Sequence, residues 1–241
     1  MKVLRALVTV GFATCFAGVA QATVVVTTGT NADTTNVGDW TFTAGSTGYA
    51  SMGAPSNSDD LAEGKTITLA AGSYLVAGTW SSLAALTDGS GGAWGTPSQT
   101  AEVMVNNESL LQLDLGASVT VGSVSSFSTY TDTARTSQNY TLWGGSSSAT
   151  TPSSAADLTA PNGWTSVASP LITYNNTTHS GSTITDTSGA LGSYRYLLWE
   201  IKNGTYGETA WSEFDVTSPT PEPAALGLFA LGGLAMLRRR K

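Results

Sequence analysis

Short runs of alternating hydrophobic and polar residues recur through the middle of the chain, and this alternation has the period of a half-buried β-strand. The run 111–115 puts three leucines on one face, with Gln112 and Asp114 on the other. The run 194–201 is apolar on both faces, as we expect for a central strand. Further predicted strands cover residues 65–69, 118–121, 124–130, 138–143 and 164–168.

The last alternating run, residues 211–216, predicts a closing strand with two different faces. Phe214 and Val216 are expected to point inward, and Glu213 and Asp215 outward.

The segments between these runs are rich in Gly, Asn and Ser, which favour turns. Residues 144–160, rich in Ser, Thr and Ala, predict a long surface loop. No long run has the 3.6-residue period of an amphipathic helix, and no internal repeat is present. Sparse charge with abundant Ser, Thr and Gly is common in secreted β-sandwiches, so the chain between its two ends predicts one all-β domain.

The N-terminal end has the three parts of a secretory signal peptide. Residues 1–5 are basic, residues 6–20 are apolar, and Ala20-Gln21-Ala22 forms an A-x-A cleavage site. We therefore expect residues 1–22 to be removed and the mature chain to begin at Thr23. The alternative is an N-terminal membrane anchor that is never cut.

The C-terminal end has a complementary three-part design. A Pro-Glu-Pro tripeptide precedes an apolar run of 14 residues, 224–237, and the chain ends in four cations. As a helix this run is roughly 21 Å long, short of the ~20 residues of a comfortable span, so we expect a weak, transient membrane anchor with its basic end on the cytoplasmic side. A buried C-terminal helix is the alternative. The residues of this design are Pro221, Glu222, Pro223, Arg238, Arg239 and Arg240.

This tail resembles the PEP-CTERM sorting signal of exopolysaccharide-producing Gram-negative bacteria, because tripeptide, Ala/Leu/Gly-rich span and Arg cluster follow in the same order. The resemblance implies recognition by an exosortase and cleavage near Pro221. It also implies release to the cell surface or extracellular matrix.

Removing both ends changes the composition of the chain. The single cysteine, Cys15, leaves with the signal peptide, so the mature domain has no disulfide. Residues 23–221 keep four cations against sixteen acids, a net charge of −12. A domain this acidic is repelled by phosphate backbones and by anionic lipid surfaces, so no nucleic-acid partner is expected.

The order of the strand-like segments resembles the discoidin, or coagulation-factor-type C, domain of the galactose-binding-like superfamily. The resemblance spans residues 61–217 and implies an antiparallel jelly-roll β-sandwich. Here the signal-peptide helix (1–22) and the hydrophobic helix of the tail (218–241) flank it. Residues 23–60 form an N-terminal extension, which either adds a strand or hairpin around residues 40–42 or stays partly disordered. The matching motifs lie at residues 61–68, 84–89 with Trp94, 111–116, 118–124, 138–142, 164–167, 194–197 and 212–216.

Catalysis is not expected. The single histidine, His179, lies in a polar segment that predicts an exposed loop, and no nucleophile-elbow motif accompanies it. No cluster of His or Cys suits zinc. Asp59 and Asp60 are adjacent acids that could serve a glycosidase, but a solvated loop explains the pair better.

Calcium is the expected cofactor. The turn 88–94 combines an acid with glycines and free carbonyls, and calcium takes six to eight oxygen ligands. Many discoidin relatives hold a structural calcium at this turn together with a glutamate of the last strand. Carried over, the implied ligands are Asp88, Ser90, Ala93, Ser212 and Glu213. An ordinary Asp-Gly turn beside a surface glutamate is the alternative.

Glycan binding is the leading functional hypothesis, because sugars pack on aromatic rings and bond to charged and amide side chains. The mature chain is rich in tryptophan. A structural matrix or coat protein without a specific ligand is the second hypothesis, and a glycan-active enzyme ranks last. The predicted ligand residues, in or near expected loops, are Trp80, Tyr130, Arg135, Trp143 and Tyr206.

Overall fold

A computed structural model describes residues 23–31, 59–75, 82–89, 103–129, 135–172, 179–202 and 207–220 of the chain. The predicted signal peptide, the segment around Trp40 and the predicted tail from residue 221 onward lie outside these ranges. Within them, no helix combines the length and apolar character needed to cross a membrane.

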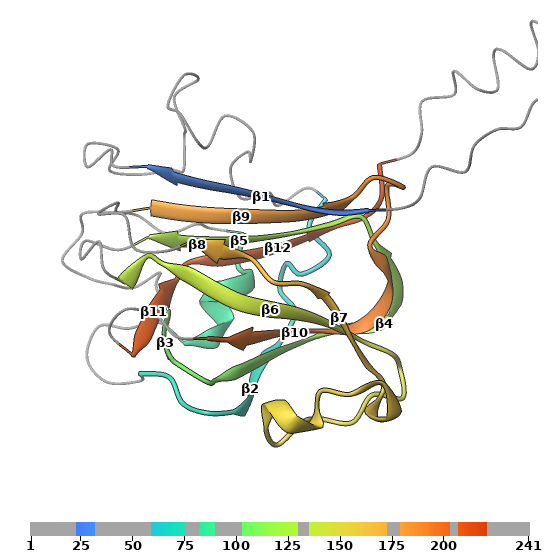
Figure 1. Cartoon of the computed structure of the whole chain (residues 1–241), viewed down its shortest axis with the longest axis horizontal. Coiled ribbons are helices and arrows are strands. Elements are labelled where there is room, and N and C mark those ends of the chain that lie inside the picture. Colours follow the sequence, from blue (N-terminus) through green and yellow to red (C-terminus); the bar gives the residue numbers. More distant parts are fainter. Residues whose placement is uncertain are drawn as a thin grey trace, which may run out of the picture.

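The described chain forms an antiparallel two-layer β-sandwich (Figure 1). The smaller sheet has the order β1 (Val24–Asn31), β9 (His179–Asp186), β5 (Ser123–Thr129) and β12 (Glu213–Thr217). The larger sheet has the order β2 (Ile67–Ala71), β4 (Leu110–Val121), β10 (Gly192–Ile201), β6 (Gln138–Gly145) and β7 (Trp164–Ala168), and β8 (Leu171–Ile172) also pairs with β6. A separate ribbon joins β11 (Glu208–Trp211) to β3 (Val103–Asn106). The predicted all-β antiparallel sandwich is confirmed.

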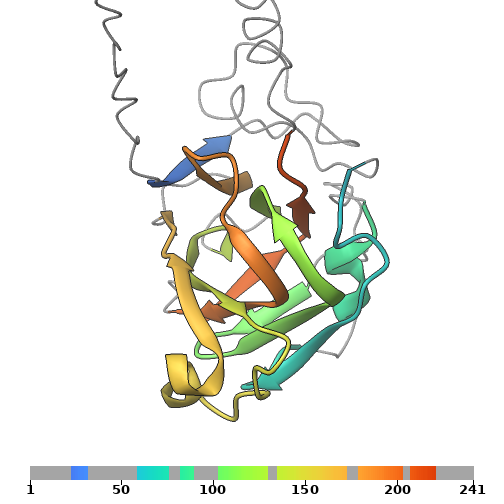
Figure 2. The same ribbon diagram turned by 90° about the vertical axis from the view of Figure 1, so that its right-hand side faces the viewer.

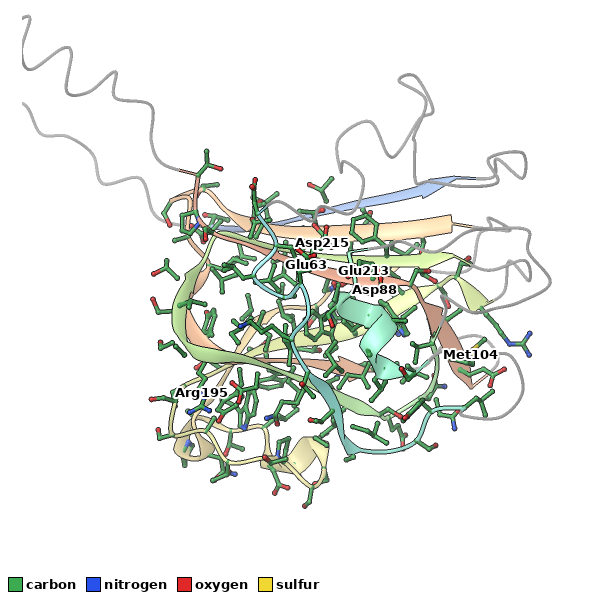
Figure 3. All side chains as sticks on the ribbon, turned by 180° about the vertical axis from the view of Figure 1, so that it is seen from behind. Glu63, Asp88, Met104, Arg195, Glu213 and Asp215 are labelled. Carbon is green, nitrogen blue, oxygen red and sulfur yellow. The ribbon has the colours of Figure 1, made fainter. Side chains whose placement is uncertain are left out.

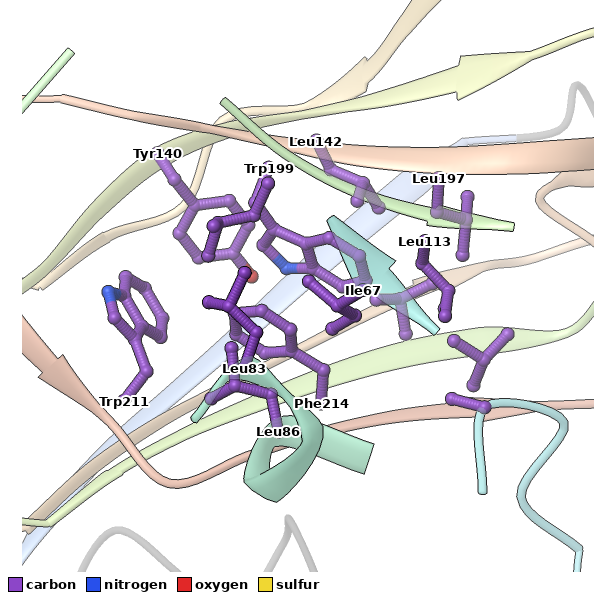
Figure 4. Packing of buried hydrophobic residues seen from close by; sticks show 14 of the residues in the cluster. Ile67, Leu83, Leu86, Leu113, Tyr140, Leu142, Leu197, Trp199, Trp211 and Phe214 are labelled. Carbon is purple, nitrogen blue, oxygen red and sulfur yellow. The ribbon is translucent and has the colours of Figure 1, made fainter. Parts of the chain in front are cut away.

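The main hydrophobic core lies between the two sheets (Figure 4). Trp199 of β10 stacks on Phe214 of β12 with ring centroids 4.2 Å apart and planes at 5°. Trp211 meets Tyr140 edge to face at 5.6 Å. Such aromatic contacts stabilise a core beyond simple burial of their area. A 3-10 helix, η1 (Leu83–Thr87), adds buried leucines at one side of this core.

A second, smaller hydrophobic cluster lies on the outer face of the larger sheet. Leu198 of β10 points to this face, between the inward-facing Leu197 and Trp199, and packs with Trp164 and Leu158. Residues 146–163, with the 3-10 turns η3 (Ala155–Asp157) and η4 (Ala160–Asn162), lie on this outer side (yellow in Figures 1 and 2). This covering segment explains why β10 is apolar on both faces. The central position predicted for it is confirmed.

A third buried region, between the sheets, is polar. The Tyr140 hydroxyl lies 2.9 Å from Ser126 Oγ and 2.8 Å from Ser182 Oγ. Ser182 Oγ donates to Gln138 Oε1 at 2.9 Å, and Gln138 Nε2 donates to the Ser126 and Ser180 carbonyls. We call the side chains of Ser126, Gln138, Tyr140 and Ser182 the serine–tyrosine network; all four residues are 0% exposed.

Several predicted boundaries were wrong. The runs 111–115 and 118–121 form one strand, β4, which passes through Gly116 at φ 85°. The run 211–216 is divided between β11 and β12, which belong to different sheets. The N-terminal extension contributes edge strand β1, and His179 begins β9 rather than lying in a loop.

Candidate metal centre and binding groove

Strand β12 alternates as the sequence predicts, but both of its faces are buried. Phe214 and Val216 enter the main core, whereas Glu213 and Asp215 lie on the opposite face at 0% and 5% exposure. The prediction that these two acids point into solvent was wrong. The segment that precedes β2 pairs with this strand: the Leu61 amide donates to the Val216 carbonyl at 2.6 Å, next to an isolated bridge between residues 60 and 217.

Asp60 is held against β12 by its own backbone contacts. Its Oδ1 accepts hydrogen bonds from the amide of Ala62 at 2.8 Å and from the amide of Val216 at 2.7 Å. The other oxygen, Oδ2, is buried without a hydrogen-bond partner. Asp60 is therefore not the solvated loop residue that the sequence predicted.

Asp60, Glu213 and Asp215 form the acidic cluster. One carboxylate oxygen of each lies within 4.8 Å of the others, and Figure 3 shows Glu213 and Asp215 on the same side as Asp88 and Glu63. Both oxygens of Glu213 are buried without a hydrogen-bond partner. Two full negative charges at this separation repel by about 3 kcal/mol at an effective dielectric of about 20. The cluster needs a positive charge or a proton.

The pKa values in the cluster also show that its negative charges are not compensated. Burial raises the pKa of Glu213 to about 9, and the neighbouring Asp215 and Asp88 add to the shift. The amide of Gly89 favours the charged form and only partly offsets these causes. Burial also raises the pKa of Asp60, although the amides of Val216 and Ala62 oppose the shift.

The structure describes three of the five predicted calcium ligands. Asp88 follows η1 and lies close enough to act on the Glu213 carboxyl. Ser212 is buried beside Glu213, and its amide donates to the Phe127 carbonyl at 2.9 Å. Ser90 and Ala93 lie outside the described residues.

Asp60 and Asp215 were missed as members of this site. The two-residue spacing of Glu213 and Asp215 was a usable signal for one of them, because such residues share a face of a strand. Nothing local marks Asp60. Its position depends on pairing across more than 150 residues, which the 156-residue separation of its bond to Val216 shows.

The acidic cluster fits a hard divalent cation. Carboxylate oxygens are the ligands that Ca²⁺ prefers, and at the usual distance of about 2.4 Å two ligands of one ion lie at most about 4.8 Å apart. The three carboxylates meet that limit. They include no imidazole or thiolate, which a transition-metal site would favour.

A groove of about 580 Å³ lies at the far end of the larger sheet. Its lining residues carry two carboxylates, one ammonium and two hydroxyls. The residues that carry these groups are Glu108, Glu200, Lys202, Ser153 and Ser154.

Glu200 is the best-fixed polar group of this groove. Trp143 Nε1 donates to its Oε2 at 2.9 Å, and Lys202 Nζ lies 3.0 Å from its Oε1. Trp143, a predicted ligand residue, is half-buried on β6 and packs in the second hydrophobic cluster. Its indole therefore orients a carboxylate at the groove.

Glu108 also lines the groove, from the turn between β3 and β4. Its φ of 61° is the single positive value at a residue other than glycine in the described ranges. Such a conformation is uncommon for a residue with a side chain. The amide of Glu108 donates to the Ile201 carbonyl at 2.9 Å, which ties the turn to β10.

Arg135 lies elsewhere. Its Nε donates to Glu208 Oε1 at 2.6 Å, and both side chains are partly buried. Its charge is therefore matched by an acid of the same domain. Of the predicted ligand residues, Trp80, Tyr130 and Tyr206 lie outside the described part of the chain, and the structure does not bring Arg135 to the groove beside Trp143.

The comparisons with known proteins bear on the two parts of the chain separately. Residues 219–241 match the PEP-CTERM protein-sorting motif. The predicted sorting signal is thus confirmed, and the motif indicates an exported protein processed by an exosortase. No curated protein sequence matches the chain.

Solved structures similar to the chain include carbohydrate-binding modules and a lectin domain. One is a module of Clostridium perfringens in complex with GalNAc-β-1,3-galactose, with a TM-score of 0.47, 11% identity and coverage of 67% of this chain and 100% of the module. The lectin domain of lectinolysin with Lewis b has a TM-score of 0.46, 15% identity and coverage of 69% and 100%. A fucose-binding module of Streptococcus pneumoniae has a TM-score of 0.44, 14% identity and coverage of 66% and 94%.

Proposed function

We propose that this protein is an exported, non-catalytic surface module whose β-sandwich binds a polysaccharide in the groove beside Trp143. The observation that carries the proposal is the groove itself: about 580 Å³, lined by residues that carry carboxylate, ammonium and hydroxyl groups. Ligand sites of small molecules have volumes of about 300–1,000 Å³ and a few well-placed polar groups.

The charges of the groove favour one class of sugar. Glu108 and Glu200 contribute two carboxylates against the single ammonium of Lys202. Carboxylates accept hydrogen bonds from sugar hydroxyls and from protonated amines. Neutral or amino sugars are therefore the proposed ligands, whereas polyuronates would be repelled by the groove and by the acidic domain around it.

The sorting motif gives this binding module its proposed destination. The apolar run 224–237 would anchor the chain in the membrane until an exosortase cuts near Pro221. The module would then act at the cell surface or in the extracellular matrix. A polysaccharide of that matrix is the partner that best suits both the groove and the route.

Binding of the full chain to immobilised polysaccharides tests the proposal. A neutral glucan, a partly deacetylated chitosan and a polygalacturonate serve as probes, and Glu200→Gln and Lys202→Gln are the groove variants. We expect binding to a neutral or amino polysaccharide that weakens at least tenfold in the groove variants. Asp114→Asn, a carboxylate outside the groove, is the matched control.

Two results would refute glycan binding at this groove. One is the absence of binding to all three polysaccharides by a folded chain. The other is binding that the groove variants leave unchanged, which would move the ligand to another surface.

A structural matrix protein is the second candidate, and the edge strand β1 favours it. Within the described residues β1 pairs on one side only, with β9, and Val24, Val25 and Val26 are about 40% exposed. An uncharged, open strand edge can pair with another chain. Concentration-dependent oligomers that Val25→Lys abolishes, in a chain that binds no polysaccharide, would select this candidate.

A further inference from the structure

The last strand of the sandwich is held at its end by the single residue that connects β4 to β5, Gly122. The Gly122 amide donates to the Thr217 carbonyl at 2.7 Å, and the Thr217 hydroxyl lies 2.7 Å from Ser123 Oγ. Beyond Thr217 the backbone continues against the same glycine, since a Cβ added to Gly122 would lie 2.6 Å from the Ser218 carbonyl oxygen and from the Pro219 nitrogen. We call these contacts the exit latch.

The exit latch includes the first residue of the sorting motif. The matched motif begins at residue 219, and Pro219 is partly buried although residues 218 and 220 on either side are exposed. An added Cβ at Gly122 would also lie 2.7 Å from Pro219 Cα, so the fold accommodates Pro219 only because residue 122 has no side chain. The boundary between domain and motif therefore lies in packed structure rather than beyond it.

The expected cleavage site is very close to this packed region. Two residues of fully extended chain span at most about 7 Å, which bounds the distance from Pro219 to Pro221. An enzyme that cuts near Pro221 must enclose the chain on both sides of the bond, and the packing of residues 218–220 on the sandwich blocks one of these sides. Cleavage of a packed segment requires local opening, and its rate follows the population of the open form.

We propose that the exit latch limits the removal of the sorting tail, because residues 218–220 must leave Gly122 before the processing enzyme can cut near Pro221. This proposal rests on the exosortase processing proposed above and not on glycan binding. Gly122 is a positioning residue, since it affects the cleaved bond only through the segment that it holds. The latch thereby lengthens the time that the folded domain spends anchored by its tail.

Two variants of the full chain separate the cleavage site from the latch in different ways. Gly122→Ala places a Cβ where Ser218 and Pro219 now pack, so these residues must move. Insertion of six Gly and Ser residues after Thr220 leaves the latch intact and moves the cleavage site away by up to about 21 Å. In an exosortase-bearing host we expect each variant to lose its tail at least about threefold faster than the wild type, measured by pulse–chase and the mass of the released domain.

The combination of the two changes gives a sharper result. Once the spacer separates the bond from the latch, opening no longer limits cleavage, so Gly122→Ala should raise the rate of the spacer variant by less than about 1.5-fold. Tyr140→Phe is the matched control, because it loosens the sandwich at the serine–tyrosine network and leaves the exit latch unchanged. Its tail should be removed within about twofold of the wild-type rate.

Hydrogen exchange measures the opening of the latch without the processing enzyme. The residue-122 amide, which donates to the Thr217 carbonyl, should exchange at least about tenfold faster in Gly122→Ala than in the wild type. In the spacer variant and in Tyr140→Phe it should exchange at the wild-type rate. The measurement uses NMR on the full chain in detergent.

Three outcomes would overturn the proposal. The first is equal removal of the tail from the wild type and the spacer variant. The second is slower removal from the spacer variant, which would mean that the enzyme binds this end of the sandwich rather than being hindered by it. The third is a Tyr140→Phe rate as fast as that of Gly122→Ala, which would assign the effect to overall stability. An uncut tail in every variant would refute the exosortase processing itself, and the latch would then limit nothing.

Discussion

The serine–tyrosine network and the acidic cluster are both buried polar regions of one sandwich, yet they differ in how their polar atoms are matched. In the network, hydroxyls, an amide and backbone carbonyls bond one another at 2.8–3.1 Å. In the cluster, both oxygens of Glu213 and one of Asp60 have no hydrogen-bond partner. The hydrogen bonds of the network are complete as they are, whereas the cluster needs a bound cation or an added proton.

This difference distinguishes buried polar groups that only stabilise the fold from buried polar groups that could bind a ligand. Neutral donors and acceptors can satisfy one another inside a protein, so a network of them stabilises and orients the core without any ligand. Ionised carboxylates can only accept hydrogen bonds, so a group of them cannot satisfy one another without a proton or a cation. The pKa values agree: burial raises the pKa of Tyr140 to about 12 and keeps its hydroxyl neutral, whereas burial raises the pKa of Glu213 to about 9, inside the range of ordinary buffers.

The largest predicted effect is on the pH dependence of stability in the ion-free protein. Glu213 has a folded pKa of about 9 against an ordinary 4.5, so its contribution is fully present below about pH 4.5 and is lost as pH rises toward 9. The free energy of unfolding should therefore fall from pH 5 to pH 8, by about 1 kcal/mol per pH unit at the steepest.

Urea unfolding in chelator at pH 5, 6, 7 and 8 measures this slope. Glu213→Gln should flatten it, and Asp114→Asn should keep it. The network has no group that titrates in this window. A flat or rising wild-type profile would therefore contradict the contrast between the two regions.

The next effect is a deletion within the network. Gln138→Leu keeps the size of the side chain, but it removes the amide that donates to the Ser126 and Ser180 carbonyls and leaves the Ser182 hydroxyl with Tyr140 alone. We expect a loss of about 3 kcal/mol in the free energy of unfolding. The loss should be the same at pH 5 and pH 8, measured by urea unfolding, and a pH-dependent loss would argue that the two regions are coupled.

Tyr140→Phe is a milder test of the same network. It removes one hydroxyl between Ser126 and Ser182 and leaves the ring packed against Trp211. The expected loss is about 1–2 kcal/mol. Ser125→Ala, whose hydroxyl bonds Thr183 nearer the surface, serves as the comparison and should cost less. Equal losses in the free energy of unfolding for the two variants would show that burial of the network does not strengthen its hydrogen bonds.

The smallest effect should come from Glu213→Gln in ion-free protein below pH 6. The wild-type carboxyl is itself neutral there, so the variant should change the free energy of unfolding by no more than about 0.5 kcal/mol. Above pH 9 the variant should instead be the more stable protein. A large loss at low pH would mean that Glu213 makes a structural bond that its neutral form cannot make.

The sequence predicted the β-elements well where the pattern was local. The run 164–168 is β7 residue for residue, and the doubly apolar run 194–201 lies within the central strand β10. Alternation also placed Phe214 and Val216 on the core side of β12. Each of these follows from side chains that alternate along one strand.

The sequence failed where a second segment decides the environment. Glu213 and Asp215 were expected to face solvent because alternation within their strand only separates its two faces. Nothing in the neighbouring sequence reveals that the chain around Asp60 covers the face on which these two acids lie. The division of 211–216 into β11 and β12 likewise depends on which sheet each half joins. For the groove, residue type alone suggested Trp143, which contacts the groove residue Glu200 but does not line the groove itself. Glu108 and Glu200 come together only through strand register.

Strand β4 runs the length of the sandwich and connects its two ends. Its first residue, Leu110, pairs with Glu200 at the groove, and its last, Val121, pairs with Gly192 close to the Gly122–Thr217 contact. Thr23, whose amide donates to Thr187 Oγ1 at 2.9 Å, lies at this second pole as well. Twelve residues of strand span roughly 36 Å at the usual rise. The first and last described residues of the domain therefore lie at the same end of β4, and the groove lies at the other end. If the chain is attached to a surface through either of these residues, the groove is about one strand length away from that surface.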